Sequence, residues 1–296
     1  RLPGLGPIIG IDRLGAATRH VQPFDHLLAR SSEVSAAELA ERRRRLRIDD
    51  LATVMYTSGT TGTPKGIRFS HRNIVFKRFA RALALPEIGE DDRFLCYLPL
   101  FHTFGRFLEM TGCVFWGATY CFARDPSIET LARQMREQAA TVLISIPMKW
   151  MQLYEAVRQN VDVEAAPDDE VRAAVRRLVG HGLRWGLSAA GYLDPEIFRF
   201  MQRNGIELMS GFGMTEATGG ITMTPPGRYR EDSLGPALPG IELGIAEDGE
   251  LLIRGPYVMQ GYLEPPNGSP SFDAEGWFHT GDLMERDEAG YFRLID

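Results

Sequence analysis

Two hydrophobic patterns alternate along the chain. Short apolar runs, of the kind found in buried strands, occupy Leu51–Tyr56, Arg93–Leu98, Ala118–Ala123, Thr141–Ile146, Leu183–Ser188 and Ile206–Ser210. Apolar residues at helical spacing occupy His71–Leu85, Ser127–Ala139, Pro147–Val157, Asp169–Val179 and Pro195–Asn204. Because the apolar strands alternate with helices, the pattern predicts an α/β fold with a largely parallel sheet covered by helices on both faces.

The pattern changes after about Pro225. The strands predicted at Ile241–Ala246 and Glu250–Arg254 flank the turn Glu247–Gly249, which is typical of a hairpin. A further strand is predicted at Tyr291–Ile295. We therefore expect residues 1–225 to form a partial α/β core and residues 226–296 to form a smaller β-rich subdomain.

Charge and composition narrow the class of protein. The net charge of −6 argues against a nucleic-acid-binding face, and an anionic ligand would need a local positive feature. Since no apolar run reaches the ~18–20 residues of a membrane helix, we expect no membrane span. Cys96, Cys113 and Cys121 fit neither a disulfide framework nor a zinc site. We expect a cytoplasmic protein and leave peripheral membrane attachment open.

The positive feature lies in a loop after the first apolar strand, Thr57-Ser58-Gly59-Thr60-Thr61-Gly62-Thr63-Pro64-Lys65-Gly66. Its glycines let backbone N–H groups turn toward an anion, and Lys65 adds a positive charge. The hydroxyl groups that can donate to phosphate oxygens belong to Thr57, Ser58, Thr60, Thr61 and Thr63. A Walker A loop has Gly-Lys-Ser/Thr, whereas Pro64 precedes this lysine and Gly66 follows it, so the P-loop and kinase interpretations lose support.

This loop resembles the phosphate-binding signature of the adenylate-forming superfamily, which includes acyl-CoA synthetases, firefly luciferase and peptide-synthetase adenylation domains. Four later segments resemble that family in the same order, namely Pro99–Gly105, Ser188–Gly191, Gly211–Glu216 and Trp277–Asp282. Taken alone, His102 would be a packed or surface histidine, Asp282 a turn residue, and Ser188–Gly191 a plain strand-to-helix turn. The order of the segments favours function for the set.

The resemblance implies a role for each position. Lys65, Thr215 and His102 would be catalytic, with Thr215 at the α-phosphate and His102 beside the carboxylate substrate. Glu216 would hold Mg²⁺ with help from Thr57, and Asp282 would accept the ribose hydroxyls. The adenine would contact Ala190, Gly191, Gly211, Phe212, Gly213 and Met214, where Phe212 replaces the usual tyrosine and Ser188-Ala189-Ala190-Gly191 departs from the commoner Gly-Gly-Ala form.

The implied reaction uses ATP and Mg²⁺ to convert a carboxylic acid to its acyl-adenylate, from which the acyl group passes to coenzyme A. Thr141–Tyr154 resembles the long-chain branch, and an aromatic-rich stretch over residues 101–116 could line an acyl tunnel or simply pack in the core. A medium-to-long fatty acid is therefore expected. The alternatives are a fatty acyl-AMP ligase that loads a carrier-protein thiol, a phosphotransferase, and a non-catalytic nucleotide-binding or scaffold fragment.

The ends of the chain suggest a piece of a longer protein. The first residue is Arg1 rather than Met, and Asp296 directly follows a predicted strand. The resemblance implies that a hinge arginine and a mobile C-terminal domain, which carries a lysine used in adenylation, would follow. We therefore expect the isolated 296 residues to be nearly inactive.

Overall fold

The computed structural model describes residues 8–11, 21–57, 64–264 and 271–295. The chain divides into two compact units, Arg1–Asp50 and Leu51–Asp296. Within the described ranges, none of the helices combines the length and the apolar character that a membrane crossing requires.

The first unit consists of short elements. Strands β1 (Ile8–Gly10) and β2 (Val21–Pro23) pair in parallel. Helix α1 (Phe24–Ala29), a 3-10 turn η1 (Arg30–Glu33) and helix α2 (Ala36–Arg45) follow. The side chain of Ser35 caps α2 by accepting a hydrogen bond from the Glu38 amide at 3.1 Å. None of the residues of α1 or α2 is buried, so this unit lacks a core in its described part.

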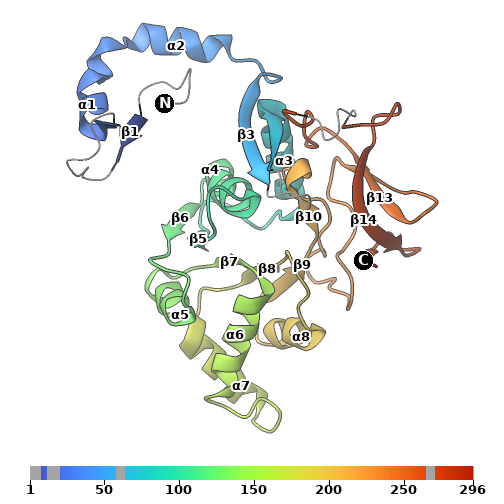
Figure 1. Cartoon of the computed structure of the whole chain (residues 1–296). Helices are drawn as coiled ribbons and strands as arrows, with labels where there is room; N and C mark the ends of the chain where they lie inside the picture. Colours follow the sequence, from blue (N-terminus) through green and yellow to red (C-terminus); the bar gives the residue numbers. More distant parts are fainter. Residues whose placement is uncertain (1–7, 12–20, 58–63, 265–270, 296) are drawn as a thin grey trace. The chain divides into compact units, whose positions relative to one another are not determined.

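A five-stranded parallel sheet organises the second unit, as predicted. Its order is β6-β5-β7-β8-β9, and every neighbouring pair runs in parallel (Figure 1). The strands are β5 (Arg93–Cys96), β6 (Thr119–Phe122), β7 (Val142–Ser145), β8 (Trp185–Ser188) and β9 (Glu207–Ser210).

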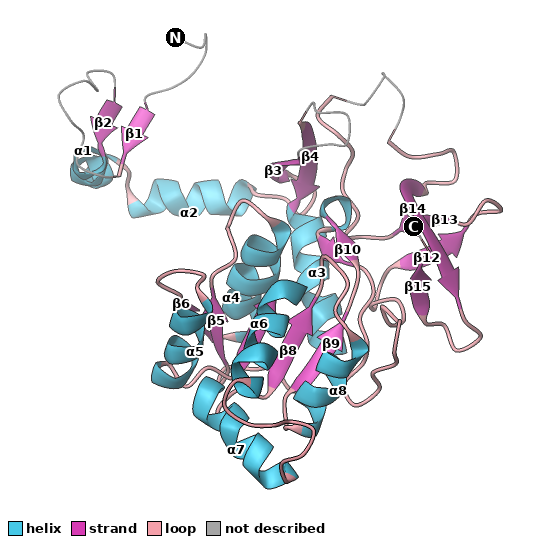
Figure 2. Cartoon of the chain, turned by 60° about the horizontal axis from the view of Figure 1, so that its bottom comes forward, coloured by secondary structure: helices cyan, strands magenta, loops and turns pink. Residues whose placement is uncertain are grey.

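Helices cover both faces of this sheet because alternate residues of each strand point to opposite sides. Leu95, Leu143 and Leu208 pack against one helical layer, and Figure 2 shows its helices grouped beside the sheet. These helices are α5 (Ile128–Glu137), α6 (Pro147–Arg158), α7 (Asp168–Val179) and α8 (Pro195–Arg203). Phe94 and Ile144 face the other core, which includes Leu108 and Cys113 from the helices that cover that side. Those are a π-helix, η2 (Phe104–Met110), and α4 (Thr111–Trp116).

The strand predicted at Leu51–Tyr56 exists but does not join the parallel sheet. It is β3 (Leu51–Thr57), which pairs in antiparallel fashion with β4 (Lys65–Ser70) in a separate two-stranded sheet. Thr57 and Lys65, near the two ends of the predicted phosphate loop, are therefore paired with each other in this hairpin. Strand β4 was not predicted, because Lys65, Gly66 and Arg68 break its apolar pattern.

The β-rich part contains a four-stranded antiparallel sheet in the order β12-β13-β14-β15. The strands are β12 (Glu242–Ile245), β13 (Glu250–Arg254), β14 (Phe278–Arg286) and β15 (Phe292–Leu294). The predicted hairpin is confirmed as β12–β13, whereas β14 was not predicted. One core joins this sheet to the β3–β4 hairpin, through Met55, Ile67, Phe69, Leu251 and Ile253. The boundary at residue 225 stays a prediction.

Helix α3 (His71–Ala84) begins after β4 with a capping box between Ser70 and Asn73. Its buried face carries the cations Lys77, Arg78 and Arg81. The Lys77 ammonium donates to the Gly220 carbonyl and lies 4.0 Å from the centroid of the Tyr257 ring. Burial, together with the charges of Arg81 and Arg78, holds the pKa of Lys77 well below its usual range. The exposed side instead carries the large apolar residues Val75, Phe76, Phe79 and Leu83.

Candidate active site

The parallel sheet gathers three of the predicted segments at one edge. Pro99–Gly105 follows β5, Ser188–Gly191 follows the end of β8, and Gly211–Glu216 follows β9. The carboxyl ends of parallel strands meet at the same edge, where open α/β sheets bind their ligands. The ends of β5 and β7 are tied by a hydrogen bond of 2.6 Å between the hydroxyl groups of Tyr97 and Ser145.

The β3–β4 hairpin presents two further predicted residues. Thr57 and Lys65 are directly paired at the end of the ladder, so their side chains extend from the same face of the hairpin. Both side chains are half-buried. The other predicted positions of this loop, Ser58, Gly59, Thr60, Thr61, Gly62 and Thr63, lie outside the described residues.

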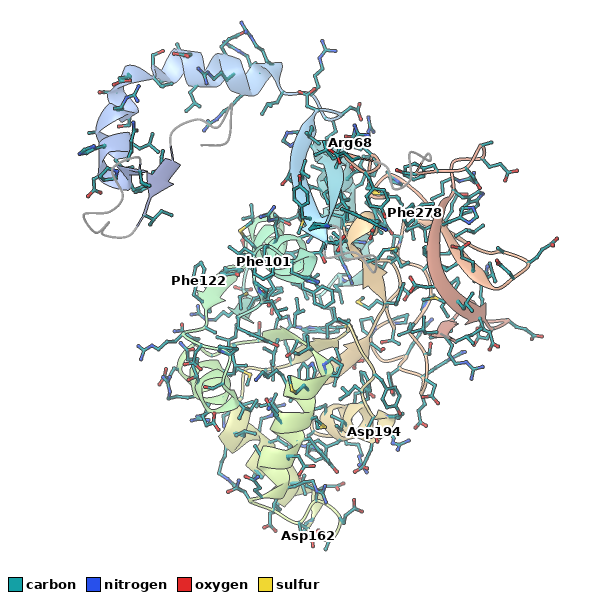
Figure 3. All side chains as sticks on the ribbon, in the orientation of Figure 1. Arg68, Phe101, Phe122, Asp162, Asp194 and Phe278 are labelled. Atoms are coloured by element: carbon teal, nitrogen blue, oxygen red, sulfur yellow. The ribbon has the colours of Figure 1, made fainter. Side chains whose placement is uncertain are left out.

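Residues 259–263 fasten the hairpin to the Gly211–Glu216 segment. The Gln260 amide donates to the carbonyl of Arg68 at 3.0 Å, and the Arg68 amide donates to the Gly261 carbonyl at 3.1 Å (Arg68 is labelled in Figure 3). The Leu263 amide donates to the Gly66 carbonyl at 2.6 Å. On the other side, the Met259 amide donates to the Glu216 carbonyl at 2.7 Å.

Tyr262 stands between the predicted cation and the predicted metal ligand. Its hydroxyl donates to Oε1 of Glu216 at 2.8 Å, and Lys65 Nζ lies 5.6 Å from the centroid of its ring. Burial of the phenol, followed by the charge of Glu216 and the hydrogen bond to it, raises the pKa of Tyr262. The sequence analysis did not identify Tyr262 as a site residue, because a tyrosine among apolar residues is typical of core packing.

The glycines of Gly211–Glu216 are required by close backbone contacts. Strand β10 (Gly213–Met214) pairs with β11 (Gly219–Gly220), and a Cβ on Gly213 would lie 2.3 Å from the Gly220 Cα. A Cβ on Gly211 would lie 2.7 Å from the Thr222 carbonyl oxygen. Phe212 and Met214 are half-buried against the core shared with the hairpin. Thr215 and Glu216 follow in a 3-10 turn, η3 (Thr215–Ala217).

The turn after β8 is strained. Ala190 has a φ of 65°, in the left-handed region that L side chains seldom adopt, and it is exposed. Gly191 has a φ of 154°, and a Cβ there would lie 3.4 Å from the Cγ of Pro147. Strained backbone of this kind concentrates at functional sites.

His102 lies on the exposed turn before η2. Its Nδ1 accepts a hydrogen bond from the Phe104 amide at 3.3 Å, and the two rings meet edge to face with centroids 5.3 Å apart. Desolvation lowers the pKa of His102, which favours the neutral imidazole at pH 7. In the described part of the chain, these contacts of His102 are with Phe104 and not with another predicted site residue. Its neighbour Thr103 lies beside Gly219 of β11.

Asp282 belongs to β14. Its amide donates to the Thr280 hydroxyl at 3.1 Å, and that hydroxyl donates to the Leu251 carbonyl at 2.8 Å. Burial, followed by the charges of Glu216 and Glu250, raises the pKa of Asp282. Asp282 is therefore close enough to Glu216 for their charges to interact, which places the fourth predicted segment near the third.

The arrangement suits a magnesium–nucleotide complex. Over the described residues, no group of three or more His, Cys, Asp or Glu side chains is arranged to hold a metal by itself. Mg²⁺ is usually held by one or two carboxylates together with substrate phosphates. Glu216 fits that pattern, since its Oε1 accepts from Tyr262 and, among the residues that the structure describes, no side chain is hydrogen-bonded to its other oxygen.

Comparison with known proteins identifies a matching family and individual relatives. Residues 11–263 match the family described as AMP-binding enzyme. A long-chain-fatty-acid–CoA ligase of Mycobacterium bovis is 30% identical over 305 residues, which cover 92% of this chain and 50% of that protein. The 3-[(3aS,4S,7aS)-7a-methyl-1,5-dioxo-octahydro-1H-inden-4-yl]propanoyl:CoA ligase of Rhodococcus jostii is 30% identical over 297 residues, which cover 97% of this chain and 54% of that protein.

Solved structures agree with the sequence relatives. The o-succinylbenzoate coenzyme A synthetase of Bacillus subtilis, in complex with ATP and magnesium ion, superposes with a TM-score of 0.70 and 27% identity. The match covers 85% of this chain and 51% of that one. The chain thus spans about half the length of the relatives that it matches.

Proposed function

The chain belongs to the family of AMP-binding enzymes, and from this we propose that it forms the nucleotide-binding part of a ligase that activates a carboxylic acid with ATP. The substrate carboxylate attacks the α-phosphorus, pyrophosphate leaves, and the acyl-adenylate then transfers its acyl group to a thiol with release of AMP. One observation carries the proposal. The Lys65 ammonium lies 5.6 Å from the centroid of the Tyr262 ring, and the hydroxyl of the same tyrosine donates to the Glu216 carboxylate, so a cation and a carboxylate contact one side chain, which suits a magnesium–triphosphate.

In this reaction the protein aligns the substrates and neutralises developing charge, and it supplies no nucleophile of its own. In the proposal, Lys65 neutralises phosphate charge and the Thr215 hydroxyl donates to the α-phosphate. Glu216 and Thr57 hold Mg²⁺, which withdraws charge from the phosphate oxygens when bound. Asp282 accepts the ribose hydroxyls.

The remaining predicted residues complete the proposed site. Phe212 stacks on adenine with its half-exposed ring. The neutral imidazole of His102 borders the carboxylate that reacts. The other proposed nucleotide contacts are the loop residues Ser58, Gly59, Thr60, Thr61, Gly62 and Thr63 and the adenine-side residues Ala190, Gly191, Gly211, Gly213 and Met214.

We propose a medium-to-long fatty acid as the substrate and coenzyme A as the thiol. The long-chain-fatty-acid–CoA ligase of Mycobacterium bovis supports this choice. The relative in Rhodococcus jostii acts, by its name, on a bicyclic propanoic acid instead, so relatives of similar identity differ in their acids. Loading of a carrier-protein thiol remains the second candidate for the acceptor.

Product analysis tests the proposed function. The protein that carries residues 1–296 is incubated with ATP, Mg²⁺ and saturated fatty acids of graded chain length, and pyrophosphate exchange is measured. Acid-dependent exchange of labelled pyrophosphate into ATP is expected, and AMP should be released as the nucleotide product when coenzyme A is added. Formation of ADP would indicate a phosphotransferase instead, and ATP binding without any turnover would indicate a non-catalytic nucleotide-binding protein.

A further inference from the structure

Tyr262 touches both charged groups of the proposed site and is assigned to neither. We propose that Tyr262 is a positioning residue that keeps the Lys65 ammonium and the Glu216 carboxylate from pairing with each other, so that one stays available to phosphate and the other to Mg²⁺. This inference rests on the proposed function and adds a role that the adenylation chemistry alone does not require.

The geometry supplies a separate contact for each charge. The Tyr262 hydroxyl donates to Glu216 Oε1 at 2.8 Å, whereas the face of its ring lies 5.6 Å from Lys65 Nζ. A cation within about 6 Å of an aromatic centroid is attracted by the ring. In the part of the chain that the structure describes, Lys65 and Glu216 form no ion pair with each other, although both contact the same side chain.

A direct pair would compete with the ligand. An ammonium bound to the Glu216 carboxylate would occupy an oxygen that Mg²⁺ needs. Its N–H groups would then donate to the carboxylate and would no longer be available to phosphate oxygens. Because such a pair lies partly out of water, its attraction would be stronger than on an open surface. The Tyr262 hydroxyl already donates to Oε1 of Glu216, an oxygen that such a pair would use.

The backbone keeps the ring in this place. An isolated bridge pairs Tyr262 with Ile67 of β4, next to Lys65 and Gly66. The Met259 amide meanwhile donates to the carbonyl of Glu216 at 2.7 Å. Tyr262 itself is 8% exposed. The strand that carries Lys65 and the turn that carries Glu216 are therefore both attached to the short segment that carries Tyr262, which holds its backbone beside the two of them.

The hydroxyl is the donor in its contact with Glu216, because a carboxylate oxygen accepts. The groups that face this hydroxyl and ring are Glu216 from η3 and Lys65 from β4, with Asp282 from β14 within electrostatic reach of Glu216. A neutral donor satisfies Glu216 Oε1 without cancelling the charge that attracts Mg²⁺.

The first test removes one oxygen atom. Tyr262→Phe is compared with Tyr257→Phe, a fully buried tyrosine whose hydroxyl reaches only backbone carbonyls, at 3.3 and 3.5 Å. ATP binding to the protein that carries residues 1–296 is titrated with Mg²⁺ by calorimetry. Tyr262→Phe should raise the Mg²⁺ concentration needed for half-maximal ATP binding about tenfold, which is typical of losing a hydrogen bond to a charged group. AMP binding without Mg²⁺ and both titrations of Tyr257→Phe should match the wild type.

The second test asks whether the competing charge is Lys65. In a Lys65→Gln background no ammonium can reach Glu216, so adding Tyr262→Phe should then shift the Mg²⁺ requirement less than twofold. A shift as large as in the wild-type background would overturn the role of keeping the charges apart. An unchanged Mg²⁺ requirement in Tyr262→Phe alone would overturn the inference and leave the proposed function standing. A wild-type protein that does not bind ATP would overturn the proposed function itself, and this inference with it.

Discussion

Thr57 and Lys65 face each other as the last directly paired residues of the β3–β4 hairpin, at the mouth of the predicted phosphate loop. The pairing fixes a hydroxyl and an ammonium on one face of the hairpin.

Lys65→Ala should lower kcat/KM for ATP by roughly 10- to 100-fold, because a charge-assisted contact to phosphate is lost. The fold should be unaffected, since Lys65 is half-buried and its described contact is with the ring of Tyr262. Steady-state kinetics and thermal unfolding measure the two effects. Lys65→Arg keeps the charge and should retain more activity than the alanine variant. Unchanged kinetics in Lys65→Ala would refute the role of this lysine.

Gly213→Ala should destabilise the protein by about 1–3 kcal/mol, because overpacking forces the backbone to move. A Cβ there would lie 2.3 Å from the Gly220 Cα and 2.5 Å from the Gly219 carbonyl oxygen. Gly89→Ala is the matched control, since a Cβ on Gly89 meets nothing within 4 Å. Chemical denaturation of both variants checks the comparison. Equal stabilities would mean that β10 and β11 lie further apart than described.

Ala190→Gly should leave stability unchanged or raise it by up to about 1 kcal/mol. Glycine removes the cost of the left-handed conformation, and its greater freedom in the unfolded chain offsets part of the gain. Ala189→Gly, at a buried neighbour without a positive φ, should be destabilising instead. Thermal unfolding separates the two variants, and a large loss of stability in Ala190→Gly would contradict the strain.

Glu109 makes stability depend on pH. This residue of η2 is 1% exposed, and within the described part of the chain its carboxyl oxygens lack a hydrogen-bond partner. Burial, aided by the nearby Cys113, raises the pKa of Glu109 to about 9 from an ordinary 4.5. Between these values the folded state holds a proton that the unfolded state has released. The contribution of Glu109 to the stability of the folded state is therefore greatest at low pH, and it falls as the pH rises from about 4.5 to about 9.

The contribution of Glu109 can be isolated with Glu109→Gln, which stays neutral. The wild type should lose up to about 1.4 kcal/mol of stability per pH unit in this window relative to the glutamine variant. Unfolding by urea at pH 6 and at pH 8.5 measures the difference. A constant difference between the two proteins would show that Glu109 is ionised throughout in the folded state.

The parallel sheet was predictable because its strands are buried on both faces. Val142–Ser145 and Trp185–Ser188 are wholly buried, so their sequences are apolar up to a final serine and are flanked by helical patterns. The place of three candidate site segments was also predictable, since Pro99–Gly105, Ser188–Gly191 and Gly211–Glu216 lie at or after the ends of parallel strands. Position at the sheet edge then follows from the parallel topology.

The sequence pattern did not predict which strands and side chains contact the β3–β4 hairpin. Strand β3 has the apolar run of a sheet strand, but its pairing depends on β4, whose burial does not follow the alternation of a half-buried strand. The contact between Tyr262 and Glu216 joins segments 46 residues apart, and no local pattern encodes it. The aromatic-rich helix η2 likewise carries no single period, because Phe107 packs in the core shared with the hairpin whereas Leu108 packs against the parallel sheet.

Helix α3 has its cations inside and its large apolar residues outside. The exposed Phe79 also meets Phe115 of α4 edge to face, with ring centroids 5.2 Å apart, so the apolar surface continues onto a second helix. Contiguous patches of this kind promote self-association in water. We therefore expect this surface to promote self-association of the chain: salts that favour precipitation should aggregate it at low concentration, and mild detergent should keep it dispersed.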